Sequence, residues 1–330
     1  MTEPAADAPG SRPSGSPLRR RIAAGAAVVA VGLLAYAVYR QREDFAAAVS
    51  GMRPSTLLAS FAAVLLALVA NMMSWRAAMT SAGASVGLVE GGRVFFLSQL
   101  GKYVPGSVWP VLAQMELTRQ HGISRARSGA AALMAMLIGV VTSSVLGAAL
   151  VVLAQPEART RYWWVLLVVP VGVAILYPPV LHRLLGLAAR VLRKPAFDVP
   201  LSGSAILRSC LWSVLMWALF GVHAWLVAQD LAGAGEVSLT GMTGAFALSW
   251  VVGFLFVVAP AGVGVREAAL VVALGGALTP AGALALALIS RVLMTLGDAV
   301  MAGVGALGRR PTAGPGERAP EPSGPAAPAP

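Results

Sequence analysis

The sequence predicts an all-α polytopic transmembrane helical bundle, and three observations support this fold class. Of the 330 residues, 57% are hydrophobic and only 12% are charged, whereas a soluble domain carries about 25% charged residues. Six apolar runs are long enough to cross about 30 Å of hydrocarbon as helices. Two more apolar regions are interrupted near their middle by glycine and proline. Together these segments give eight or so hydrophobic helices.

The six runs are expected to be full crossings, and each follows a loop that contains polar residues. They cover residues 22–39, 55–79, 128–154, 162–182, 206–229 and 281–307. The first follows three arginines, as a signal peptide would, but it is longer than a typical apolar core of such a peptide and no small-residue cleavage site follows it. We therefore expect an uncleaved crossing.

The two ends of the chain differ from the rest in composition. Residues 1–18 are polar and rich in Pro, Ser and Gly, and residues 308–330 consist mostly of Pro, Ala and Gly. Such segments cannot bury an apolar core, so both are expected to be disordered. The remainder, residues 19–307, is expected to form a single transmembrane domain.

The positive charge predicts the orientation of this domain. The net charge is +11, but the Lys and Arg residues lie in short loops between apolar runs, which argues against a nucleic-acid partner. Most of them fall in alternate loops, and the positive-inside rule assigns those loops to the cytoplasm. We therefore expect a multi-pass protein of the cell (inner or plasma) membrane with both termini in the cytoplasm.

The interrupted regions, residues 93–116 and 241–278, are expected to be hairpins. The first has flanks predicted to be cytoplasmic, and the second has flanks predicted to be external. The second could be re-entrant or could cross fully. The chain then divides into inverted halves at about 19–156 and 157–307, an organisation found in many secondary transporters.

No constellation typical of catalysis or metal binding is visible. The single cysteine, Cys210, lies in an apolar run, and the three histidines have no spacing typical of metal ligands. We therefore expect no metal, no cofactor and no enzymatic activity.

The breaks predict anion sites. Interrupted backbone at membrane depth persists only where protein buries it or where it lines a cavity. A helix that begins there directs its positive dipole end into that cavity. Lys102 lies beside the first break and Arg266 beside the second, and lipid phosphates are the abundant anions at that depth. The structural alternatives are that Lys102 extends to the interface and that Arg266 pairs with Glu267.

The last crossing carries Arg291 and Asp298, seven residues apart and therefore on one helix face. Charges within a crossing often mark a pathway, although an ion pair with Glu267 or Arg266 could simply lock the helix in place. Aromatic residues beside the first break could line a site or act as interfacial anchors. The candidate lipid-headgroup residues are Lys102, Tyr103, Pro105, Gly106, Trp109, Pro260, Gly262, Gly264, Arg266, Glu267, Arg291 and Asp298.

Two stretches carry a resemblance to a known family. Residues 97–109 (LSQLGKYVPGSVW) and 260–268 (PAGVGVREA) resemble the two signatures of the flippase-like family, also called the lysylphosphatidylglycerol synthase transmembrane region family. The resemblance spans about residues 20–307 and implies a membrane domain that moves lipids between leaflets. In the aminoacyl-phosphatidylglycerol enzymes a soluble transferase follows this domain. We expect no such transferase here, because the chain ends about 23 residues after its last crossing.

Three functions remain open from the sequence. The first is a flippase or transporter-like protein that binds an anionic phospholipid or a lipid-linked headgroup. The second is a membrane scaffold for a partner lipid synthase or glycosyltransferase, since family members occur beside glycosyltransferases. The third is an intramembrane lipid-modifying enzyme, for which Glu116 or Glu267 could supply an acid.

Overall fold

The computed structural model confirms the all-α fold class. The described residues are 39, 43, 46, 49–103, 108–154, 160, 163–191, 201–232, 237–255, 265–274 and 277–307. Within these ranges the regular structure is helical and no strand occurs. The terminal segments 1–18 and 308–330 and nearly all of the first predicted crossing lie outside the described residues.

Four long helices match predicted crossings closely. They are α3 (Pro54–Ser81), α6 (Arg125–Ala154), α10 (Gly203–Ala232) and α13 (Pro280–Leu307), each 28 to 30 residues long. At 1.5 Å per residue their length is about 42–45 Å, which exceeds the hydrocarbon thickness. All four are apolar enough to span a membrane.

The predicted crossing at 162–182 differs from a straight helix. It consists of η2 (Trp163–Leu167) and α8 (Val168–Leu176), and an 80° bend separates them from the helix that follows, α9 (Pro178–Val191). The bend follows from the sequence, because Tyr177 precedes a proline and is extended, with ψ 126°. A residue before proline is disfavoured in the helical region.

Helix α9 is amphipathic. Leu181 and Leu185 are buried against α6 and α10, while His182 and Arg183 are exposed. A helix with one apolar and one basic face fits the membrane–water interface. The segment before the bend, η2 and α8, is about 24 Å long, so the predicted crossing at 162–182 is a bent helix pair rather than one straight helix.

Both interrupted regions form pairs of short helices, as predicted. The first contains α4 (Leu88–Gln99), η1 (Leu100–Tyr103) and α5 (Trp109–Arg119). The second contains α11 (Leu239–Leu255) and α12 (Val265–Leu274). The breaks themselves fall outside the described residues, and with them the candidates Pro105, Gly106, Pro260, Gly262 and Gly264.

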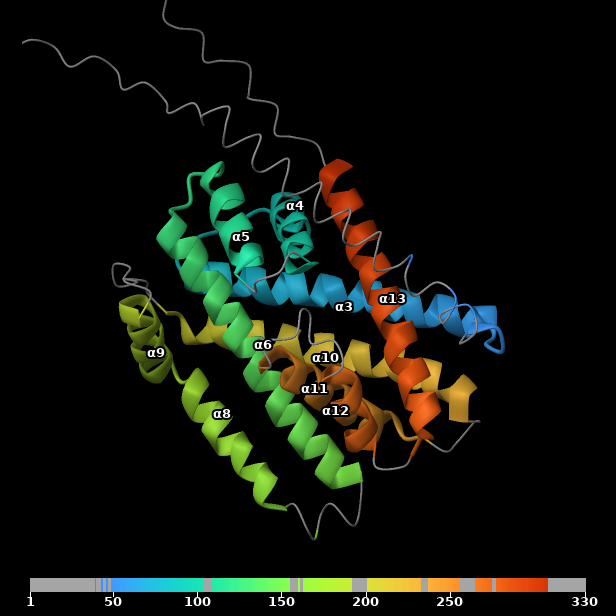
Figure 1. The fold of residues 1–330 in the computed structure, drawn as a ribbon. Helices are drawn as coiled ribbons and strands as arrows, with labels where there is room; N and C mark the ends of the chain where they lie inside the picture. The colour runs from blue at the N-terminus through green and yellow to red at the C-terminus, as the bar shows by residue number, and fades with distance from the viewer. Residues whose placement is uncertain are drawn as a thin grey trace, which may run out of the picture.

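Helices α3 and α10 lie side by side and antiparallel at the centre of the bundle (Figure 1). Three polar pairs join the two helices. As the residue number rises along α3 it falls along α10, which shows that the helices are antiparallel. These pairs are Arg53 with Asp230, Ser60 with His223, and Ser74 with Ser209. Helices α6 and α13 cross this central pair steeply, one toward each end (Figure 1).

The helix contacts repeat between the two halves, which supports the inverted repeat. Helix α13 packs on α12, α4 and α3, and α6 packs on the corresponding α5, α11 and α10. In Figure 1 the ends of α3 and α10 assigned to the cytoplasm lie at the left, that of α6 at the upper left and that of α13 at the top, while their other ends lie toward the right or the bottom. The helix directions thus agree with the alternation expected from the charges.

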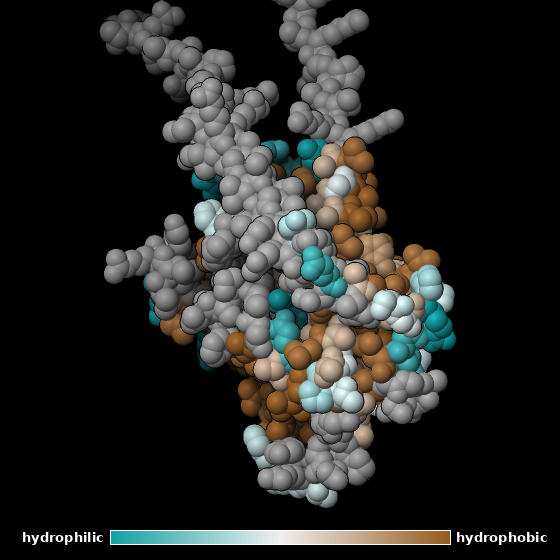
Figure 2. Space-filling view, turned by 45° about the vertical axis from the view of Figure 1, so that its right-hand side comes forward, coloured by the Kyte–Doolittle hydropathy of each residue, from teal (hydrophilic) through white to brown (hydrophobic). Residues whose placement is uncertain are grey.

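The surface is as apolar as a lipid-facing surface should be. Large hydrophobic side chains are exposed on many helices, including Leu58, Val173 and Val304. Figure 2 shows apolar residues over much of the described face, with hydrophilic ones near the top, at the right-hand edge and in smaller groups near the middle. Soluble monomers rarely expose such large contiguous apolar patches, so the protein is a multi-pass membrane protein.

Candidate functional site

Helix α13 presents a polar strip on one face. Its polar members are Ser290, Arg291, Thr295 and Asp298, and Met294 lies among them; all five recur at the i, i+4 and i, i+8 positions that share one side of a helix. Two of them are charged in an otherwise apolar helix. Because charges inside a membrane helix are costly, they face the bundle interior and need partners.

The first hairpin supplies the partner of Asp298. Lys102 Nζ lies 2.5 Å from Asp298 Oδ2, and the Tyr103 hydroxyl donates to the same oxygen at 2.6 Å. The carboxylate is almost fully buried, with 3% of its side chain exposed, whereas Lys102 is 35% exposed. Lys102 therefore binds α13 rather than extending only toward the interface.

A close backbone approach positions these two residues. A Cβ on Gly101 would lie 3.0 Å from the Pro110 nitrogen and 3.0 Å from the Trp109 carbonyl carbon. Only glycine lets η1 lie this near the start of α5. Trp109 begins α5 with 42% of its surface exposed, which places it at the rim of the site rather than in the ion-pair cluster.

The second hairpin supplies Arg266, at the first turn of α12. Its guanidinium carbon lies 4.8 Å from the centroid of the Phe246 ring, and Nη2 lies 3.7 Å from the sulfur of Met294. Gly253 of α11 permits this packing, since a Cβ there would lie 2.9 Å from the Arg266 Cβ. Among the described residues, no carboxylate forms an ion pair with Arg266.

Glu267 pairs with Arg291 and not with its neighbour in sequence. Arg291 Nη2 lies 3.0 Å from Glu267 Oε1, and both side chains are largely buried, at 24% and 19% exposure. Beside this pair is a cavity of about 10 Å³, close to the smallest volume that admits a water molecule. It is lined by Phe246, Arg266, Glu267, Leu270, Ala287, Ser290 and Arg291.

The structure thus brings five charged candidates together along α13. Met294, which Arg266 contacts, and Asp298, which Lys102 contacts, are four residues apart and so about 6 Å along the helix axis. Cations from both hairpins therefore reach the same face of one helix. Each of the two ion pairs is electrically neutral, so Arg266 gives these five residues a net charge of one positive unit.

Glu116 lies apart from this group. Its carboxylate pairs with Arg119 at 3.0 Å and with Arg125 at 2.5 Å, where α5 turns into α6, and its side chain is 47% exposed. The hydrogen bond from Arg125 lowers the pKa of the Glu116 carboxyl, and the charges of both arginines act in the same direction. Glu116 therefore forms ion pairs at the surface, away from the charged residues along α13.

A buried histidine also lies in this region, and it was not among the candidates taken from the sequence. His223 of α10 has no exposed surface, and its ring nitrogens lie 2.6 Å from Ser60 Oγ and 3.0 Å from Ser290 Oγ. Its partners are 163 and 67 positions away, so no local motif reveals the contact. The only available signal was a histidine within an apolar run.

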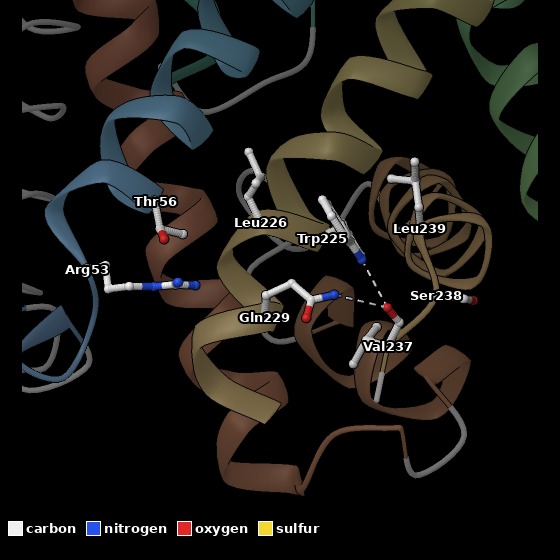
Figure 3. A pocket seen from close by; sticks show the side chains of 8 residues that line it. All are labelled: Arg53, Thr56, Trp225, Leu226, Gln229, Val237, Ser238 and Leu239. Carbon is white, nitrogen blue, oxygen red and sulfur yellow. Dashed lines mark hydrogen bonds between the residues drawn. The ribbon is translucent and has the colours of Figure 1, made fainter. Parts of the chain in front are cut away.

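A larger pocket of about 560 Å³ lies at the opposite ends of α3 and α10 from α9. Figure 3 shows its lining: Arg53, Thr56, Trp225, Leu226, Gln229, Val237, Ser238 and Leu239. Trp225 and Gln229 both donate to the carbonyl of Val237, at 3.0 and 3.3 Å. None of the twelve candidate residues lines this pocket.

Comparison with known proteins agrees with the resemblance of the two motifs. The family described as "Lysylphosphatidylglycerol synthase TM region" matches residues 22–301, which is most of the chain. A comparison with curated protein sequences found no match. The chain therefore belongs to the lysylphosphatidylglycerol synthase transmembrane region family.

Proposed function

We propose that this protein binds an anionic lipid headgroup between its two hairpins and α13, and that it moves the lipid between leaflets. The observation that carries the proposal is the meeting of Lys102 and Arg266 on one face of α13. Two cations delivered by separate hairpins to a single helix suit a phosphate better than two isolated structural residues would.

The charge balance favours an anion over a cation. Arg266 has an aromatic ring and a sulfur as its described neighbours, so a phosphate would supply a stronger partner than either. The amides at the start of α12 add the positive end of a helix dipole. The paired Lys102 and Arg291 could exchange their carboxylates for phosphate oxygens as a headgroup moves along α13.

Ion exchange of this kind accounts for the pairing of Lys102 and Arg291 with carboxylates beside Arg266, which has no such pair among the described residues. A buried charge without a partner would lower the stability of the unliganded protein by several kcal/mol. If every charge kept its protein partner permanently, none would be available to bind a ligand. Pairs that a phosphate can replace keep the unliganded protein stable. They also offer successive positions between the leaflets without covalent chemistry.

Transbilayer movement of labelled lipid tests the proposal. Purified protein would be reconstituted in vesicles that contain a fluorescent phosphatidylglycerol, and a membrane-impermeant quencher would report the fraction reached from outside. We expect wild type to expose inner-leaflet label faster than empty vesicles, and Arg266→Gln to approach the empty-vesicle rate. Arg119→Gln, at the exposed corner of α5, is the matched control and should behave as wild type.

Two results would contradict the proposal. One is equal rates for wild type and empty vesicles with phosphatidylglycerol and with lipid-linked sugar phosphates. The other is equal rates for wild type and Arg266→Gln. A protein that instead co-purifies with a lipid synthase or glycosyltransferase and moves no lipid would be a scaffold, and new lipid products on expression would indicate an enzyme.

We further propose that both termini lie in the cytoplasm and that the protein resides in the cell membrane. The basic loops support this orientation, as does the amphipathic α9, whose exposed Arg183 and Arg190 lie on the side assigned to the cytoplasm. A C-terminal fluorescent protein that folds only in the cytoplasm should be bright. A dark fusion at normal expression would reverse the orientation.

A further inference from the structure

The buried His223 connects three helices through hydroxyl groups. Ser60 of α3 faces its Nδ1 at 2.6 Å and Ser290 of α13 faces its Nε2 at 3.0 Å. A neutral imidazole has one N–H and one lone pair, so it donates to one serine and accepts from the other. Both ring nitrogens are therefore satisfied without water.

This arrangement accepts a proton without moving heavy atoms. A serine hydroxyl can donate or accept, so the donor and acceptor roles along the chain can reverse by rotation of O–H bonds. If a proton adds to the free lone pair, both ring nitrogens donate and both serine oxygens accept. No partner is lost, and the imidazolium remains fully hydrogen-bonded.

The hydroxyl chain ends at the charged site. Ser290 contacts His223 and also lines the 10 Å³ cavity with Arg266, Glu267 and Arg291. The histidine is therefore one hydroxyl group away from the cavity in which the net positive charge of the site lies.

Neighbouring charges decide when the imidazole can be protonated. Helix α12 contributes Arg266 and Glu267, and α13 contributes Arg291 and, two turns beyond Ser290, Asp298. Helix α11 has no charged residue and presents Phe246, 6.0 Å from the imidazole centroid. The charged residues of α3 and α10 themselves, Arg76, Arg208 and Asp230, lie about two or more turns from the hydrogen-bonded chain.

We infer that His223 is a proton-binding site coupled to headgroup binding, so that an anionic lipid and one proton are taken up together. The inference rests on the proposed function. The net positive charge of the empty site opposes an imidazolium nearby, and a bound phosphate neutralises that charge and favours the imidazolium. Such coupling is reciprocal, so protonation also strengthens binding of the anion.

The two halves of the protein differ at the position of His223. Ser209 and His223 lie 149 positions after Ser60 and Ser74, respectively, so the pair Ser74–Ser209 is the counterpart of the pair Ser60–His223. One half has a hydroxyl that does not titrate where the other has an imidazole. The titratable position is therefore confined to one half.

Calorimetry of binding in two buffers of different ionisation enthalpy measures the protons taken up. The probe is short-chain phosphatidylglycerol added to the full chain in detergent, from about pH 5 to about pH 8. We expect wild type to take up a proton and its affinity to rise as the pH falls, by up to about tenfold per pH unit. His223→Gln keeps a donor and an acceptor and should bind with no proton uptake.

The controls separate a structural role from a proton site. His121→Gln removes an exposed histidine and should leave the uptake unchanged. Ser290→Ala should reduce the uptake, whereas Ser209→Ala, in the counterpart pair, should not. Binding without proton uptake by wild type, or unchanged uptake in His223→Gln, overturns the inference and leaves the proposed function standing. Absence of binding by wild type overturns both.

Discussion

Removal of the Lys102 charge should destabilise the protein mainly because it leaves the buried Asp298 carboxylate without its ion-pair partner. The carboxylate of Asp298 is 97% buried, with Lys102 at 2.5 Å and the Tyr103 hydroxyl at 2.6 Å as its partners. Loss of one partner from a buried ion pair costs about 3–5 kcal/mol. Because 35% of the Lys102 side chain is exposed, water replaces part of its interaction, and we expect a cost near the low end, about 3 kcal/mol.

A double-mutant cycle tests this explanation. Lys102→Gln and Asp298→Asn should each lower the stability, whereas the double variant should recover about 2 kcal/mol relative to the sum of the single costs, because no unpaired charge remains. Reversible unfolding in mixed micelles, followed by tryptophan fluorescence, gives the free energies. Additive costs would refute the reasoning, since they would mean that the two charges do not interact.

Three further predictions concern packing, hydrogen bonding and pH. Gly101→Ala should lower stability by about 1–3 kcal/mol through contact with the α5 backbone, whereas Gly139→Ala, with nothing within 4 Å, should not; thermal melting in detergent distinguishes them. Tyr103→Phe removes a hydrogen bond to a carboxylate and should cost about 1.5–3 kcal/mol in the same assay. The lowered pKa of Glu116 means that its pairing stabilises the fold above its unfolded-state pKa and is lost as the pH falls through the folded value; Arg125→Gln should weaken this dependence in acid unfolding curves, and an unchanged curve would contradict it.

Much of the fold could be predicted because lipid imposes simple rules. Apolar length identified α3, α6, α10 and α13 within a few residues, and glycine and proline identified both hairpins. The same rules did not show that the predicted crossing at 162–182 is bent. Run length alone cannot show an 80° bend, although the two prolines after Tyr177 mark its position.

The sequence predicted which charged residues belong to the site but not which of them pair with each other. The helix breaks identified Lys102 and Arg266 as candidate site residues, and the cost of charge in a membrane identified Arg291 and Asp298. Their pairing depends on which helices touch, and here Glu267 prefers Arg291 to its neighbour. His223 could not be found in this way, because its hydrogen bonds join residues that only the packing of α3, α10 and α13 brings together.

Native mass spectrometry tests the central claim most directly, by counting the anionic lipids that the purified protein retains. If the two hairpins and α13 form one headgroup site, wild type should retain one phosphatidylglycerol per chain at low lipid concentration. Arg266→Gln should lose it, and Arg119→Gln should keep it. Equal retention by wild type and Arg266→Gln would show that the cations on α13 do not form a lipid site.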